Sequence, residues 1–268
     1  MSQSARGALG VVLAVFAAAV LVTSATGAPA RHAGGTLTFC SDITYPPEEF
    51  YQGNTKAVGS DIDIGNAVAK RMGRTAKFQN TGFDGIIAAL LAKKCDAVIS
   101  GMNDTASRRK QVGFGDYLSV GQSLMVKKGN PSHVAGLASL SGKSVSVEVG
   151  TTNKDFLDAA SKKLKAQGKP AIKVQAFPHD TDAAAALKTG KVDAYFGDSP
   201  VVAYYIQKDS SFAFGGSPIN PIPVGIAVRK DDPATKSGIQ KAITAMYADG
   251  SIKRILAKWH MSAFALKK

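Results

Sequence analysis

The hydrophobic pattern of the chain alternates between short apolar runs and longer segments with helical spacing. Residues 36–40 predict a strand, and residues 61–72 predict an amphipathic helix that ends at Gly73. The same patterns predict further helices at 83–91, 153–165, 181–188, 235–249 and 251–258, and further strands at 97–100, 144–149 and 192–197. Such alternation is typical of parallel sheets covered by helices.

Two units of this pattern resemble each other, and each consists of a helix, a short basic turn and a buried strand. The alignment pairs Asp96-Ala97 with Asp193-Ala194, Ala89-Leu90 with Ala186-Leu187, and Lys94 with Lys191. The match predicts two lobes of like construction rather than one long sheet.

Two extended apolar segments, at residues 122–129 and 223–229, are suited to connect these lobes. We expect them to form a two-stranded hinge, after which the chain returns to the lobe in which it began. This organisation predicts a first lobe made of residues 31–122 plus 226–268 and a second lobe made of residues 123–225.

Residues 1–30 have the pattern of a secretory signal peptide, with Arg6, an apolar run and the small residues Ala28-Pro29-Ala30. We expect cleavage after Ala30 and a periplasmic mature protein. An uncleaved membrane anchor is the alternative, but the run is shorter than the roughly 20 residues that a span needs. Cys40 lies inside a predicted strand beyond the new amino terminus, so we expect no lipid anchor and a freely diffusing protein.

Cys40 and Cys95 are the two cysteines of the chain, and an oxidising compartment permits a disulfide between them. Cys40 ends one predicted strand, whereas Cys95 precedes the start of another. If those strands are parallel neighbours, the two sulfurs are too far apart to be bridged. We therefore expect free, buried thiols, with the disulfide as the alternative.

The bulk composition excludes few functions. The chain has 268 residues, 45% of them hydrophobic, and a net charge of +13, but its lysines are scattered and no nucleic-acid-binding signature is present. The four histidines, His32, His133, His179 and His260, show no metal-ligand spacing, so we expect each in a loop or at the surface. We expect no metal, no cofactor and no nucleic-acid partner.

One predicted strand end carries an exposed arginine. The strand stops at Gly101, and Thr105 can cap a short helix whose first turn contains Arg108. A guanidinium grips a carboxylate through two parallel hydrogen bonds, and free N–H groups at a helix start add positive potential. The alternative is that residues 108–110 are a solvated run of charges.

Other polar residues follow predicted strand ends, where the crevice of a doubly wound sheet collects its ligand. Asp42 and Tyr45 follow the first strand, Gly150-Thr151-Thr152-Asn153 follow the first strand of the second lobe, and Asp198 follows the last.

From Thr36 to Trp259 the chain resembles the extracytoplasmic solute-binding proteins of ABC importers, in particular the polar amino-acid-binding class, family 3. The motifs that carry the resemblance are Ser41-Asp42-Ile43-Thr44-Tyr45-Pro46-Pro47, Val58-Gly59-Ser60-Asp61-Ile62-Asp63-Ile64, Phe83-Asp84-Gly85-Ile86-Ile87, Ser100-Gly101-Met102 with Thr105 and Arg108, Gly150-Thr151-Thr152, and Asp193-Ala194 with Asp198-Ser199-Pro200. The resemblance implies an α/β fold of the type II periplasmic binding proteins, in which two doubly wound α/β lobes are joined by two hinge strands.

The resemblance also implies roles for single residues. Arg108 would clamp the α-carboxylate of an amino acid, and Asp198 would receive its α-ammonium group. The groups expected to assist them or to enclose the ligand are Tyr45, Phe83, Ser100, Gly101, Asn103, Thr105, Thr151 and Thr152. Such opposite charges suit a zwitterion that loses its water.

The side chain of the ligand is predicted from positions 42 and 148. In this class both positions commonly face that side chain, and two acids, Asp42 and Glu148, would favour a cationic amino acid such as arginine, lysine or ornithine. Strand alternation leaves open that Glu148 points to solvent, and an amide side chain such as that of glutamine is the alternative.

The chain departs from the family pattern at two places. Glu48 stands where an aromatic residue usually follows the double proline, and Asn103-Asp104 replaces the usual Ser/Thr-Ile. We expect Asp104 to lie close to Arg108 and to draw off part of its charge. These departures leave a modified amino acid open as the ligand.

The predicted function is capture of an amino acid by hinge closure, followed by delivery to the ABC permease, by a monomeric protein that is not an enzyme. Two alternatives remain. A cyclohexadienyl or arogenate type of dehydratase on the same scaffold would need a proton donor, for which Glu148 is the candidate. A periplasmic sensor module is the other.

Overall fold

The computed structural model describes residues 34–53 and 55–266, so the predicted leader and His32 lie outside the described residues. The helices in this part are α1 Ser60–Arg71, α2 Ile86–Leu91, α3 Ala106–Arg109, α4 Thr152–Ala166, α5 Asp180–Lys188, α6 Ser199–Lys208, α7 Pro233–Ala248 and α8 Ser251–Lys258. Short 3-10 helices lie at η1 Phe83–Gly85, η2 Leu137–Leu140 and η3 Ser262–Phe264. No helix of the described part combines the length and the apolar character that a membrane span requires.

The strands are β1 Thr36–Ser41, β2 Thr44–Tyr45, β3 Glu49–Gln52, β4 Lys56–Val58, β5 Thr75–Asn80, β6 Ala97–Val98, β7 Val112–Lys127, β8 Ser144–Glu148, β9 Lys173–Phe177, β10 Ala194–Asp198, β11 Phe212–Phe214 and β12 Ile219–Arg229. Nine of them form one sheet in the order β5-β1-β6-β12-β7-β10-β8-β9, with β11 beside β7. Strands β2, β3 and β4 form a separate small sheet.

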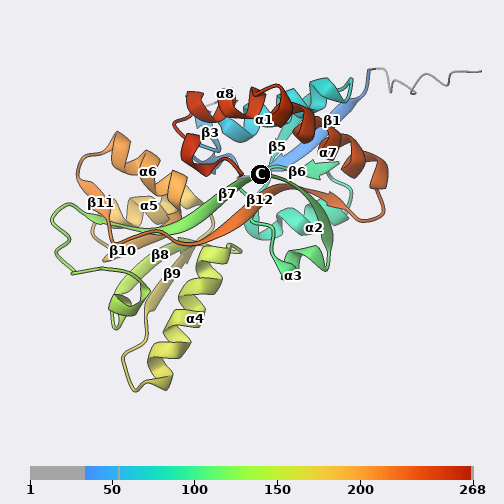
Figure 1. The fold of residues 1–268 in the computed structure, drawn as a ribbon. Coiled ribbons are helices and arrows are strands. Elements are labelled where there is room, and N and C mark those ends of the chain that lie inside the picture. The colour runs from blue at the N-terminus through green and yellow to red at the C-terminus, as the bar shows by residue number, and fades with distance from the viewer. Residues whose placement is uncertain (1–33, 54, 267–268) are drawn as a thin grey trace, which may run out of the picture. The chain divides into compact units, whose positions relative to one another are not determined.

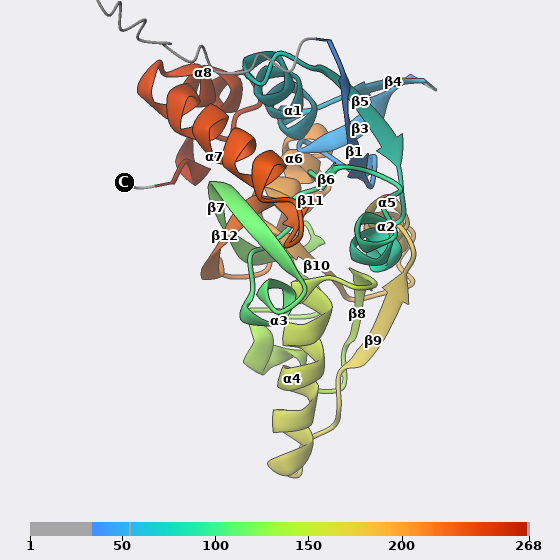
Figure 2. The same cartoon turned by 90° about the vertical axis from the view of Figure 1, so that its right-hand side faces the viewer.

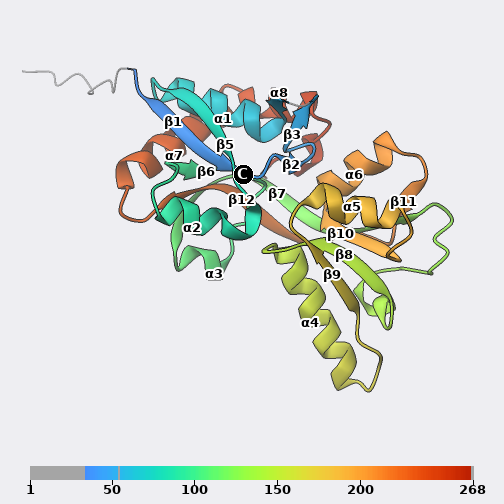
Figure 3. The ribbon, with the colours of Figure 1, turned by 180° about the vertical axis from the view of Figure 1, so that it is seen from behind.

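Helices cover both faces of each lobe, as the predicted fold class requires. In the first lobe, one core lies under α1, α7 and α8, and a second core lies under α2. In the second lobe, one core lies under α4 and the other under α5 and α6. Figures 1 and 3 show the two groups of helices from opposite sides. The fold is therefore two doubly wound α/β lobes.

Strands β7 and β12 connect the lobes and run side by side (Figure 1). The first part of β7 pairs with β12, its last part pairs with β10 and β11, and β12 also pairs with β6. Hydrogen bonding is consequently continuous through one curled sheet, which differs from the expectation of separate sheets. The lobe boundaries at residues 122/123 and 225/226 stay a prediction, because both strands run through them.

The two units that resemble each other in sequence make the same local contacts. Each aspartate accepts a hydrogen bond from the backbone of its lobe's first strand, Asp96 from Thr38 N and Asp193 from Ser144 N, both at 2.8 Å. In each unit the lysine of the basic turn also donates its backbone N–H to a carbonyl group of the preceding helix, Lys94 N to Ala89 O and Lys191 N to Ala186 O. The short sequence match therefore corresponds to a shared helix-turn-strand geometry.

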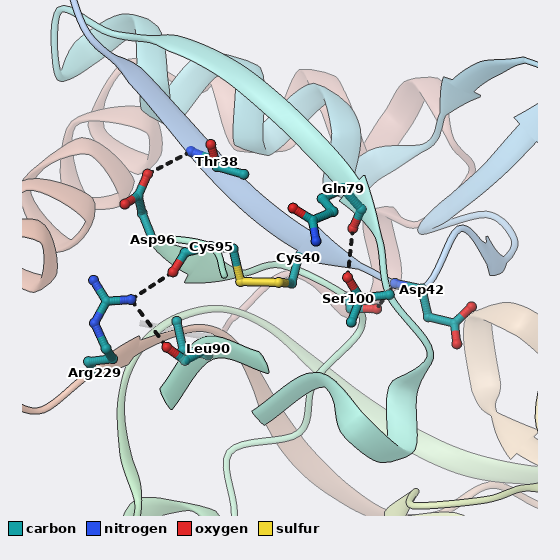
Figure 4. Close-up of a disulfide and its surroundings, with 10 residues drawn as sticks. Thr38, Cys40, Asp42, Gln79, Leu90, Cys95, Asp96, Ser100 and Arg229 are labelled. Carbon is teal, nitrogen blue, oxygen red and sulfur yellow. Dashed lines mark hydrogen bonds between the residues drawn. A yellow bond between two sulfur atoms is a disulfide. The ribbon is translucent and has the colours of Figure 1, made fainter. Parts of the chain in front are cut away.

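Cys40 and Cys95 form a disulfide, so the expectation of free thiols is wrong. The strands are parallel neighbours as expected, with Cys40 opposite Val98. However, Cys95 lies in a bend before β6 and not on the line of the strand, and its Cα atom is 5.7 Å from that of Cys40. Figure 4 shows Arg229 beside this bond, donating to the carbonyl groups of Leu90 and Cys95.

Reduction of the disulfide is expected to destabilise the protein strongly. The bond spans a sequence separation of 55 residues, and a loop of this length restricts the unfolded chain by about 4 kcal/mol in the chain-entropy model. Urea unfolding with and without reductant should show a loss of this size. A Cys40→Ser/Cys95→Ser variant should already have the lower stability and should not respond to reductant, and an equal response of both proteins would contradict the expectation.

Candidate functional site

The ends of four strands from both lobes meet at one small cavity. From the first lobe it is lined by Asp42, Tyr45, Phe83, Ser100, Gly101 and Asn103, and from the second lobe by Glu148, Thr151, Asn153 and Asp198. Nine of these ten residues were predicted to bind the ligand, whereas Asn153 was named at its strand end but was given no binding role. The free space between them is about 10 Å³, which is the room of about one water molecule. A larger ligand can enter only if the surrounding groups move apart.

Arg108 lies beside the cavity and contacts both lobes. Thr105 caps α3 by accepting from Arg108 N at 3.2 Å, as the sequence predicted. The Arg108 guanidinium donates to Asn103 O at 2.8 Å and to Gly150 O at 3.1 Å, and it lies over the Phe83 ring, 5.3 Å from its centroid. Arg108 belongs to α3, and Gly150 directly precedes Thr151, the cap of α4; both helices are labelled in Figure 2.

The Arg108 guanidinium has no carboxylate within 4.0 Å among residues 34–53 and 55–266. Its side chain is nevertheless buried, since Arg108 is only 9% exposed. Burial lowers the pKa of this guanidinium, whereas the charge of Asp198 raises it. An anionic group with two oxygens could therefore take over hydrogen bonds that two backbone carbonyls now accept.

The expectation that Asp104 draws charge from Arg108 is wrong. Asp104 is held by the next residue, Arg109, whose Nε and Nη2 atoms donate to its two carboxylate oxygens at 2.6 Å each. This bidentate pair satisfies the buried carboxylate of Asp104. Arg108 is thus left to face the cavity region without that neighbour, and Arg109 is the solvated arginine of the run.

The start of α4 is tied to the first lobe. Thr151 caps this helix by accepting from Lys154 N, and its hydroxyl donates to Glu148 O at 2.8 Å. Thr152 does not line the cavity, but its hydroxyl donates to Asn103 Oδ1 at 2.6 Å across the lobes. Thr105 also lies outside the cavity lining, where it serves as the helix cap.

Asp198 lies at the end of β10 and faces the cavity from the second lobe. Asn153 Nδ2 donates to its Oδ1 atom at 3.2 Å, and the Asp198 backbone N–H donates to the hydroxyl of Tyr45 at 3.3 Å. Burial raises the pKa of Asp198 to about 6, although hydrogen bonds from Asn153 and Tyr45 and the charge of Arg108 oppose this. A cationic group in the cavity would favour the ionised carboxylate.

Glu148 also faces the cavity, so the solvent-facing alternative is wrong. It is 4% exposed, and its Oε1 atom has no hydrogen-bond partner within the described part of the chain. Burial raises the pKa of Glu148 well above its usual range, and the charges of Asp180, Asp42 and Asp198 add to the effect. This leaves an unpaired acceptor in an acidic environment, which suits a ligand with N–H donors.

Asp42 and Asp180 complete the acidic surroundings. Asp42 accepts from the Thr44 hydroxyl and from Phe83 N at 2.8 Å each, and His179 Nδ1 approaches its carboxylate to 3.7 Å from the other lobe. Asp180 accepts from the hydroxyl groups of Tyr195 and Tyr205. Burial raises the pKa of Asp180 to about 7, although these two hydrogen bonds oppose it.

The residues that sequence reasoning missed lie near motifs it had found. Asn153 directly follows Gly150-Thr151-Thr152, and its position at a strand end was the available signal. His179 and Asp180 follow β9, a short edge strand that was not predicted, so no predicted strand end pointed to them. The remaining histidines of the described part, His133 and His260, are exposed as expected. That part contains no cluster of His, Cys, Asp or Glu side chains suited to a metal ion.

Comparisons with known proteins agree with this architecture. A sequence profile of the bacterial extracellular solute-binding proteins, family 3, matches residues 37–262. The ABC transporter arginine-binding protein 1 of Escherichia coli strain K12 is 31% identical over 247 residues, which cover 90% of this chain and 96% of that protein.

Solved structures give the same result. An ancestral arginine-binding protein bound to arginine is 38% identical with a TM-score of 0.78, covering 84% of this chain and 98% of that one. An ancestral arginine-binding protein bound to glutamine is 37% identical with a TM-score of 0.78, covering 85% of this chain and 98% of that one. An ancestral amino acid-binding protein described as a precursor of cyclohexadienyl dehydratase is 32% identical with a TM-score of 0.76, covering 84% and 95%.

The raised pKa of Asp198, about 6 in the folded protein, predicts a specific pH dependence of stability. An aspartate in the unfolded chain loses its proton near pH 3.9, so above that pH the folded state holds the proton more tightly. The free energy of unfolding should then fall by up to about 1.4 kcal/mol per pH unit until Asp198 ionises. Urea unfolding between these pH values should show a shallower fall for Asp198→Asn, and parallel curves would contradict this assignment.

Proposed function

This chain belongs to the bacterial extracellular solute-binding proteins of family 3, and we propose that it captures a free amino acid and delivers it to the permease of an ABC importer. The ligand would be held between the lobes and would favour the closed arrangement, because it contacts both of them. Hinge closure is the characteristic motion of periplasmic binding proteins. The pair β7 and β12 would be the hinge.

One observation carries this proposal: a buried guanidinium and a buried carboxylate from different lobes flank the same cavity. The Arg108 guanidinium donates to two backbone carbonyl groups and is not paired with an acid of the described part. Asp198 lines the cavity. A zwitterion needs a fixed cation for one end and a fixed anion for the other when it leaves water. We expect a dissociation constant on the order of a micromolar or below, which corresponds to a binding free energy of about −8 kcal/mol or more favourable.

The acidic surroundings favour a cationic side chain on the ligand. Glu148 presents an unpaired oxygen, and Asp42 lies on the other side of the cavity. A guanidinium or ammonium group would supply the N–H donors and the charge that these acids lack. An amide is the alternative, and an ancestral relative solved with glutamine supports keeping it.

The location and the partners follow from the family and from the leader. We propose export to the periplasm, with cleavage after Ala30, and a monomer that docks on the permease. Both cysteines of the sequence are joined to each other, so neither is free to carry a lipid. This supports a protein that diffuses freely between encounters with the membrane.

Two alternative functions have less support. A dehydratase would use Glu148 as its proton donor, but the relative described as a precursor of such an enzyme is itself named as an amino acid-binding protein. The named relatives reported above bind amino acids. No observation on this chain favours a sensor module.

The proposal is tested with a panel of amino acids that includes arginine, lysine, ornithine and glutamine. One ligand should raise the unfolding free energy by about 2.7 kcal/mol at 100 times its dissociation constant. Arg108→Lys should raise the dissociation constant of that ligand by more than about tenfold, because lysine cannot form two parallel hydrogen bonds to a carboxylate. Arg109→Lys is the matched control and should bind normally. Normal binding by Arg108→Lys would remove the proposed carboxylate clamp.

Closure itself can be tested at Gly150. A Cβ atom at this residue would lie 2.7 Å from Asp84 Cα of the other lobe, and Gly150 has φ +77°. Gly168 has a similar φ, +70°, but its Cβ would meet nothing within 4 Å. Both alanine variants should therefore lose about 1–2 kcal/mol of stability from backbone strain. Calorimetric titration should show weaker binding for Gly150→Ala alone, and equal affinities would argue against a closed complex of this geometry.

A further inference from the structure

Behind the cavity, the first lobe buries three acids that play no part in the site described above. Glu48 is 1% exposed, and Glu49 and Asp61 are completely buried. Within residues 34–53 and 55–266, no lysine, arginine or histidine forms an ion pair with any of them. Three charges cannot be held so close together without a cation, so some of these groups must carry protons.

Glu49 and Asp61 hold the strand end that lines the cavity. The Ser100 hydroxyl donates to Glu49 Oε1 at 2.7 Å, and the same hydroxyl accepts from Asp42 N at 2.9 Å. Gly101 N donates to Asp61 Oδ2 at 2.9 Å. Glu49 and Asp61 are thus each hydrogen-bonded to a residue that lines the cavity, Ser100 and Gly101 respectively.

The remaining oxygens of the two acids are left to each other. Glu49 Oε2 and Asp61 Oδ1 are buried and accept no hydrogen bond from any group in the described part. Glu49 lies near enough to Asp61 for a side-chain hydrogen bond from Glu49 to lower the pKa of Asp61. A hydrogen bond between two carboxyl groups requires one proton. We propose that Glu49 and Asp61 share a buried proton and that this pair is a positioning element for Ser100 and Gly101 in the candidate site.

The surroundings indicate which member carries the charge. Asp61 accepts from Gly101 N and from the Tyr117 hydroxyl at 2.7 Å, and it lies in the first turn of α1. Two donors and a helix start stabilise a carboxylate. Among the described residues Glu49 accepts a side-chain hydrogen bond only from Ser100, so the proton resides on Glu49 and is donated to Asp61.

The neighbouring carboxylates all act on the pKa of Glu49 in the same direction. Burial raises the pKa of Glu49 well above its usual range, and the charges of Asp61, Glu48 and Asp42 raise it further, whereas the Ser100 hydrogen bond opposes them. Tyr117 is the remaining group, and it binds to Asp61 as a neutral donor. Burial also raises the pKa of Asp61, but its hydrogen bonds lower it.

The local fold is built to bring the pair together. The start of α1 docks on the loop that leads into β3, through Ser60 N to Pro47 O at 3.0 Å and Asp61 N to Glu48 O at 2.8 Å. A Cβ atom at Gly59 would lie 2.0 Å from Glu48 O. Only glycine permits this approach, and the approach places Asp61 beside Glu49.

The first test uses ligand-free protein and Glu49→Gln, which keeps an N–H donor for Asp61 and an acceptor for Ser100. The unfolded chain loses the Glu49 proton near pH 4.3, while the folded state retains it. The stabilisation by Glu49 is thus complete below that pH and is lost as the pH rises. The folding equilibrium constant of the wild type should fall relative to Glu49→Gln by up to about tenfold per pH unit. Parallel pH profiles of stability for the wild type and Glu49→Gln would contradict the proposal of a shared proton.

The second test measures the position of Gly101 by hydrogen exchange of its backbone amide. The Gly101 amide should exchange equally slowly in the wild type and in Glu49→Gln. In Glu49→Ala it should exchange at least about tenfold faster, which corresponds to the loss of one buried hydrogen bond. If Glu49→Ala does not fold, Ser100→Ala is used in its place, because it removes the hydrogen bond from the Ser100 hydroxyl to Glu49. Glu48→Gln is the matched control, because it removes a neighbouring buried acid and so changes the pH profile of stability. It should leave the Gly101 amide protected from hydrogen exchange. Equal exchange in all variants would overturn the positioning role.

The proposal rests on the proposed function only because Ser100 and Gly101 line the candidate site. If a ligand is identified, Glu49→Gln should bind it like the wild type, and Glu49→Ala should bind it more weakly. If no amino acid binds to the wild type, the proposed function fails, while the pH profile and the exchange rates still decide the role of the pair.

Discussion

The cost of removing carboxylates from water governs the organisation of this protein around its cavity. An isolated buried charge costs several kcal/mol, so each acid needs donors, a counter-ion or a proton. Asp104 has the bidentate Arg109, and Asp180 has two tyrosine hydroxyls. Among the acids that line the cavity, Glu148 keeps an unpaired oxygen, and Asn103 and Asn153 beside it keep unpaired amide atoms. These unsatisfied groups lie where a ligand would be enclosed.

The sequence predicted most of the architecture because its helices and inner strands have strong hydrophobic periodicity. The helix predicted at 61–72 is α1, and the strand at 144–149 is β8. Site residues were predictable for a related reason: the carboxyl ends of parallel strands meet at one edge, so residues such as Asp42 and Asp198 are brought together by topology alone. Their roles in ligand binding stay predictions.

The features that were missed depend on conformations that periodicity does not encode. Strands β5 and β9 are the two edge strands of the sheet and carry only two or three apolar residues among exposed lysines and glutamines, so neither was predicted. The disulfide depends on a bend before β6 that turns Cys95 back towards β1. Likewise, the orientation of α3 decides which of the two consecutive arginines, Arg108 or Arg109, pairs with Asp104. In each case, tertiary packing decides between locally equivalent options.

The path of the chain has a consequence for how the protein is synthesised. The main core of the first lobe combines residues such as Leu37 and Ile64 with Ile239 and Leu256, which come from the two ends of the described sequence. The cores of the second lobe contain only residues between Leu124 and Ile219. During vectorial translation, the later-encoded lobe can therefore complete its core while the earlier one still waits for α7 and α8 to leave the ribosome. A nascent chain in that interval would expose the apolar residues of the first lobe that α7 and α8 later cover.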